Sequence, residues 1–227
     1  QMCIRDRYRE IPGSFADGQT YSLRSPIYEF SDLSYGPIDE NVLYSPRVAP
    51  AMYGLGLLEA IPESTIRAQS DPDDIDGDGI SGRPNWVWDP VAQRHTLAKF
   101  GLEANVANLH QQVAGAAVGD IGITTSIFPD QNCLPAQTAC LSATQDSQPE
   151  LDDIRLSRLV MYSRSLAVPA KRDVEEPEVR KGEQLFMQTG GAGCHTPSFK
   201  TSPTAAMPAL ANQDISPYTD LLLHDMG

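Results

Sequence analysis

The chain has 227 residues, enough for one large domain or two small ones with a sizeable core. Hydrophobic residues make up 41% and charged residues 21%, which excludes a disordered chain, and no apolar run is long enough to cross a bilayer. The net charge of −13 disfavours binding to nucleic acid and would attract a basic partner protein. The alternative is that the negative charge only keeps the chain soluble.

Both ends of the chain look cut. Residues 1–7, "QMCIRDR", match a translated sequencing-library adapter, so we expect an assembly scar there and set Cys3 aside. The last residues, "LLLHDMG", stop within a motif-like stretch, so we expect a piece lacking both ends. A secretion signal could then lie outside the sequence.

Four segments carry helical patterns, and loops or short strands fill the rest. Residues 8–46 are rich in Tyr, Ser, Gly and Pro, and we expect loops with one or two short strands there. The helices are predicted within 49–66 (stopped by Pro62), 106–123, 149–169 and 178–188. Short strands or extended segments are predicted at "NWVWDP" and "RHTLAKFG". This predicts a mainly α fold with long irregular loops, divided at a linker near 168–176 into regions 8–168 and 169–227.

Cys194 and His195 form the last two positions of the haem-attachment pattern C-x-x-C-H, in which two thiols add to the haem vinyls and the His binds iron. Gly191 stands in place of the first cysteine. The preceding helix carries Gly182 and Phe186 one turn apart, as helices before c-type haem sites do. The segment favours a single-thioether haem site, and the alternative is a buried cysteine beside a surface histidine.

Two further patterns suggest cross-linking and metal binding. Cys133 and Cys140 lie in a polar loop and could form a disulfide, or bind zinc together with Cys194 and His195. The stretch "DDIDGDGISG" has acidic residues at alternate positions before a glycine, as in the first half of a calcium loop, but lacks the closing Glu. Its ligands would be Asp74, Asp76, Asp78 and the carbonyl of Ile80; otherwise it is a solvated acidic turn.

Taken together, the segments resemble the di-haem c-type oxidoreductases related to bacterial cytochrome c peroxidases, in particular the thiol oxidoreductase-like peroxidases. The resembling stretches are "SPRVAPAMYGLGLLEAIPE", "DGDGISGRPNWVWD", "QQVAGAAVGDIGIT", "LAVPAKRDV", "GEQLFMQTGGAGCHTP" and "PYTDLLLHDMG". The resemblance implies a periplasmic or extracellular, mainly helical protein with cytochrome c-like haem domains, whose second haem domain begins in 169–227 and whose first haem site lies upstream of Tyr8.

The same resemblance implies roles for individual residues. Cys194 would form the thioether and His195 would be the proximal iron ligand, and the substrate, the reductant and the oligomeric state stay open. The distal iron ligand could be Met207, His224 or Met226, and Trp86 or Trp88 could relay electrons. The partner would be a small electron-donor protein, such as a basic cytochrome or a cupredoxin. The competing hypothesis is a secreted, calcium-stabilised module without haem or enzymatic activity.

Overall fold

The structure is a computed structural model that describes residues 3–33, 36–144 and 146–226. Gln1 and Met2 of the predicted scar lie outside the described residues, as does Gly227. The described chain is 27% helix and 18% strand, with six helices and three small two-stranded sheets. The fold is therefore mixed and loop-rich. The predicted helices, irregular loops and strands are present, but the share of strand is larger than a mainly α fold implies.

The elements have the following bounds. The α-helices are α1 (Leu55–Glu59), α2 (Glu63–Arg67), α3 (Leu109–Ile121), α4 (Thr138–Leu141), α5 (Asp153–Ser165) and α6 (Pro177–Gln188). The strands are β1 (Cys3–Ser14), β2 (Thr20–Ser31), β3 (Trp86–Asp89), β4 (Arg94–Leu97), β5 (Phe199–Lys200) and β6 (Asp214–Ile215). Two 3-10 turns are η1 (Gly191–Gly193) and η2 (Pro208–Leu210).

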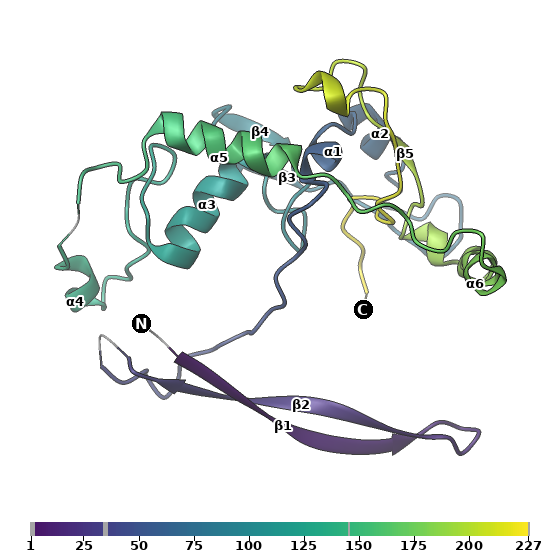
Figure 1. The fold of residues 1–227 in the computed structure, drawn as a ribbon, viewed down its shortest axis with the longest axis horizontal. Helices are drawn as coiled ribbons and strands as arrows, with labels where there is room; N and C mark the ends of the chain where they lie inside the picture. The colour runs from purple at the N-terminus through teal and green to yellow at the C-terminus, as the bar shows by residue number, and fades with distance from the viewer. Residues whose placement is uncertain (1–2, 34–35, 145, 227) are drawn as a thin grey trace. The chain divides into compact units, whose positions relative to one another are not determined.

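The chain divides into two compact units, of which the first holds Gln1–Val48 and Cys133–Ala143. Its main feature is the antiparallel hairpin of β1 and β2, drawn as long twisted strands in Figure 1. The prediction of short strands in 8–46 underestimated their length. Asp17-Gly18 is a sequence typical of hairpin turns, and Gly18 has a φ of +89°. The polar residues on either side of this turn, which suggested loops, belong to solvent-exposed strands.

The second unit holds Ala49–Asn132 and Thr144–Gly227. Helices α3 and α5 pack side by side in it (Figure 1). The side chain of Asn108 accepts a hydrogen bond from the backbone of Gln111 to start α3, and Asp152 accepts one from Arg155 to start α5. Their shared core is apolar and consists of Phe100, Leu109, Ala114, Leu156 and Val160.

A second core cluster lies where α1, α2, β4 and β5 meet the C-terminal segment, and it contains Ile61, Ile66, Leu97, Phe199 and Leu221. Pro62 separates α1 from α2, as predicted, because proline cannot donate the backbone hydrogen bond that a continuing helix needs. Among the described residues, no helix is long and apolar enough to span a membrane.

Candidate functional site

Helix α6 leads directly into the segment that carries Cys194 and His195. Pro177 occupies the first turn of α6, where no backbone donor is needed, and Gly190 adopts the left-handed conformation (φ +83°) that ends it. The turn η1 then delivers Cys194. The apolar side chains of Val179, Leu185 and Met187 on α6 stay about half exposed.

The imidazole of His195 is oriented by a backbone carbonyl. Its Nδ1 lies 3.0 Å from the carbonyl oxygen of Tyr218. A carbonyl can only accept a hydrogen bond, so Nδ1 carries the proton and the lone pair of the neutral ring lies on Nε2. Thr196, the next residue, also fixes this segment, because its hydroxyl donates a hydrogen bond to Oε1 of Gln69 at 2.6 Å.

Cys194, the residue before His195, has a free thiol and is half-buried. The pair therefore offers a thiol and, one residue on, a ring nitrogen with its lone pair free. A histidine that donates Nδ1–H to a carbonyl while Nε2 faces a metal is the usual arrangement of a protein metal ligand. These donors fit the covalent attachment of haem.

The position of the missing first cysteine is filled by an aromatic ring. A Cβ placed on Gly191 would lie 2.6 Å from Cε2 of Phe186 and 3.0 Å from the Phe186 carbonyl oxygen. The same ring packs against His195, with centroids 6.2 Å apart, and edge-on against Tyr218 at 5.6 Å. Phe186 thus links α6 to the imidazole and to the residue that orients it.

The structure groups a different set of carboxylates from the predicted calcium ligands. Carboxylate oxygens of Asp71, Asp74 and Asp76 lie within 4.8 Å of one another. Asp78 is not in this group, and its carboxylate accepts a hydrogen bond from the backbone N–H of Ile80 at 2.8 Å. Calcium binding stays a prediction, and Asp71 was missed because it precedes the alternating pattern.

The acidic loop touches the turn that carries the Cys-His pair. A Cβ on Gly193 would lie 2.5 Å from Cδ1 of Ile80, so that isoleucine side chain packs over the turn. The carbonyl of Ser81, the next residue, accepts a hydrogen bond from Nδ1 of His224 at 2.8 Å. The loop is therefore packed between η1 and the C-terminal segment.

The three distal-ligand candidates have different surroundings. Nε2 of His224 lies 2.7 Å from a carboxylate oxygen of Asp220, so both ring nitrogens are already hydrogen-bonded and one bond would have to break before iron could bind. Met226 is exposed, and Met207 is half-buried just before η2. None of the three roles is tested by these positions.

Trp86 and Trp88 lie on strand β3, as expected, and are about half exposed. The guanidinium of Arg67 lies over the Trp86 ring, 6.0 Å from its centroid. His95 meets Trp88 edge-on across the β3–β4 pair. Both indoles have local packing partners, and the electron-relay role stays a prediction.

Cys133 and Cys140 form a disulfide in the first unit, with their Cα atoms 5.8 Å apart. Disulfide sulfurs are not thiolates, and zinc is bound by thiolates. The alternative of a zinc site built from these two cysteines with Cys194 and His195 is therefore wrong for this structure.

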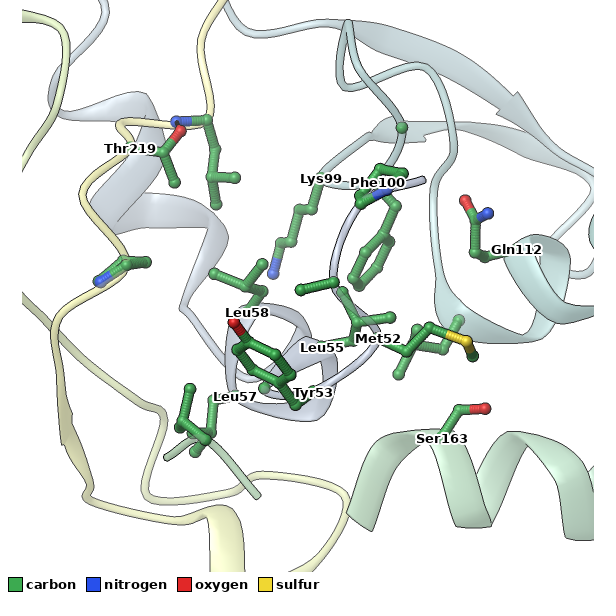
Figure 2. A pocket seen from close by; sticks show the side chains of 18 of the residues that line it. Met52, Tyr53, Leu55, Leu57, Leu58, Lys99, Phe100, Gln112, Ser163 and Thr219 are labelled. Atoms are coloured by element: carbon green, nitrogen blue, oxygen red, sulfur yellow. Dashed lines mark hydrogen bonds between the residues drawn. The ribbon is translucent and has the colours of Figure 1, made fainter. Parts of the chain in front are cut away.

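The second unit contains a largely apolar cavity of about 620 Å³, shown in Figure 2. Cys194 and His195 do not line it, but Pro217 and Thr219, on either side of Tyr218, do. Its main lining residues are Met52, Tyr53, Leu55, Leu57, Leu58, Phe100, Leu109, Val113 and Leu221.

Lys99 is the one cation among the lining residues, and its ammonium end points toward α1 (Figure 2). Its Nζ donates to the carbonyl oxygens of Glu59 at 2.9 Å and Ile61 at 2.5 Å. Burial lowers the pKa of Lys99 from 10.5 to about 8, although the negative charges of Glu59 and Glu63 act in the opposite direction. Nothing in the sequence around Lys99 signals this environment.

Sequence reasoning found the Cys-His pair but not the residues that hold it. Tyr218 acts through its backbone carbonyl, which leaves no trace in the choice of side chain. The contact of Phe186 with Gly191 depends on how α6 turns into η1. Tyr218 lies 23 residues from His195. Phe186 lies close to Gly191 in the sequence, but that short spacing alone does not show that the ring packs on the glycine.

Comparison with known protein families gives a match over nearly the whole chain. The sequence model of the family described as "Di-haem oxidoreductase, putative peroxidase" matches residues 6–227. Searches of curated proteins and of solved structures gave no significant match. Because the family match covers nearly the whole chain, this protein belongs to the di-haem oxidoreductase family.

Proposed function

We propose that this chain is the haem-bearing part of a c-type oxidoreductase that transfers electrons and reduces peroxide, attaching haem through Cys194 and His195. The observation that carries the proposal is the 3.0 Å contact from His195 Nδ1 to the Tyr218 carbonyl, which leaves Nε2 for iron beside a free thiol. Bound haem would supply one-electron transfer and reaction with peroxide.

The residues of the chain have separate tasks in this proposal. Cys194 anchors the porphyrin, His195 ligates its iron, and the Tyr218 carbonyl strengthens the imidazole as a ligand by accepting its other proton. The half-exposed apolar side chains of α6 provide a surface that a porphyrin could cover. Residues 169–227 would belong to a cytochrome c-like haem domain.

Location and partner follow from the same proposal. Haem c and the Cys133–Cys140 disulfide both suit an oxidising compartment, the periplasm or the cell exterior. The net charge of −13 favours a small basic electron donor, such as a cytochrome or a cupredoxin. Association with such a donor would weaken as ionic strength rises.

The test is expression in a host that attaches haem c, followed by a haem stain on a denaturing gel. The chain should stain, and Cys194→Ala should lose the stain while remaining folded. His195→Ala should retain part of the stain but change the absorption spectrum of the iron. If the unmodified chain has no stain, the haem proposal fails and the alternative of a secreted module without haem is favoured.

A further inference from the structure

The turn η1 departs from the two-cysteine pattern at Gly191, and the structure has no free space there for a larger side chain. Gly191 does not have a positive φ, so its backbone conformation would accept a side chain. The obstacle is space, since a Cβ there would lie 2.6 Å from Cε2 and 2.8 Å from Cδ2 of the Phe186 ring. Contacts this short require the ring or the turn to move.

The ring is held in this place from several sides. Phe186 is the one half-buried residue in the last turn of α6, whereas Leu185 and Met187 beside it are exposed. Its ring meets Tyr218 edge-on and His195 at a tilt. A contact of this kind between aromatic rings is favourable beyond the burial of area. Moving the ring would therefore disturb the residues that orient the imidazole.

We propose that the phenyl ring of Phe186 takes the place of the missing first cysteine side chain, so that haem is joined to this chain by one thioether, at Cys194, and keeps one vinyl group unreacted. This inference rests on the proposed function. In the attachment, the S–H bond of Cys194 breaks, a C–S bond forms to the inner vinyl carbon, and the proton goes to the outer one. No electron is gained or lost, and the second vinyl finds no thiol.

Placing a cysteine at position 191 is the direct way to test whether the Phe186 ring blocks that position. Restoring the cysteine by Gly191→Cys would not restore the second thioether, because the ring covers the position of the new side chain. Removing the ring as well, in Gly191→Cys with Phe186→Ala, would open the position. Phe186 is thus a positioning residue for the turn and the imidazole.

The first test measures attachment in the full chain, by the absorption spectrum of the pyridine haemochrome, which reports how many vinyl groups remain. We expect one unreacted vinyl in the unmodified chain and in Gly191→Cys, and none in the double variant. A second double variant with Phe186→Leu guards against poor folding of the alanine version. Two thioethers in Gly191→Cys alone would overturn the inference.

The second test needs no haem and uses the chain with Cys3→Ser and Cys194→Ala, so that the introduced cysteine is the thiol that reacts. The rate at which a maleimide modifies Gly191→Cys is compared with that of Gly182→Cys, a matched control on α6 with nothing within 4 Å of its new Cβ. We expect slow modification at 191, rapid modification at 182, and acceleration at 191 when Phe186 is also truncated. Equal rates at 191 and 182 would refute the position of the ring.

The two tests separate the failure of the inference from that of the proposed function. A chain without covalent haem removes the proposed function and the single thioether with it. The maleimide rates then still decide whether the ring covers position 191. A haem-bearing chain whose Gly191→Cys variant gains a second thioether keeps the proposed function and loses only the inference.

Discussion

The buried amine of Lys99 should make the stability of the protein depend on pH in an alkaline window. Its pKa is about 8 in the folded chain and 10.5 as an unperturbed group. Between these values the unfolded chain binds a proton that the folded chain has released, so the free energy of unfolding rises with pH. Below pH 8 both states are protonated, and the cost of burying the charge is present in full.

The size of the effect follows from the two pKa values. Their difference of 2.5 corresponds to about 3 kcal/mol at about 1.4 kcal/mol per pKa unit. Lys99→Met removes the titrating group while keeping an unbranched apolar side chain of similar length. The stability of the unmodified chain relative to this variant should rise by up to about 3 kcal/mol between pH 8 and pH 10.5.

The assay is urea unfolding of both proteins at several pH values from 7 to 11. The comparison cancels the tyrosines and other lysines, which titrate in both chains. The loss of the hydrogen bonds to Glu59 and Ile61 shifts the difference at pH 7 without giving it a slope. A difference in stability that stays constant or falls as pH rises would refute the assignment of a buried, weakly basic amine at Lys99.

Three further predictions concern packing, a buried ion pair and the acidic loop. Gly56→Ala should destabilise by about 3 kcal/mol, because the new Cβ would overlap the carbonyl oxygen of Arg164, whereas Gly115→Ala should stabilise by about 1 kcal/mol. Glu59→Ala should cost about 3 kcal/mol, since it leaves the largely buried Arg164 guanidinium without its carboxylate partner. Calcium at a hundred times its dissociation constant should stabilise the chain by about 2.7 kcal/mol, and Asp74→Asn should abolish that gain.

Each of these has a control or a contradicting result. Equal stability of the two glycine variants in urea would mean that α1 does not approach α5 as closely as described. Glu59→Gln should cost less than Glu59→Ala, because an amide oxygen can still accept from the backbone of Leu109. Asp78→Asn should leave the calcium effect on the melting temperature intact, and its loss in that variant would favour the ligand set predicted from sequence.

The sequence determined the features that depend on neighbours along the chain. The helices α3, α5 and α6 follow from apolar spacing, capping residues and prolines. The strands β3 and β4 lie within the two segments predicted to be short strands or extended. The Cys-His pair and the combination of motifs were sufficient to identify the family that the comparison then showed. Each of these signals comes from residues that are close together in the sequence, so it can be recognised without the tertiary structure.

Tertiary structure decided what depends on distant contacts. The length of the β1–β2 hairpin depends on cross-strand pairing, which composition rich in Tyr, Ser, Gly and Pro conceals. The proton position on His195 is set by the Tyr218 carbonyl, 23 residues away, and the low pKa of Lys99 by burial against α1. The ring of Phe186 is held against Tyr218, which lies 32 residues further along the chain. Such contacts arise when separate segments pack together, and no single stretch of sequence encodes them.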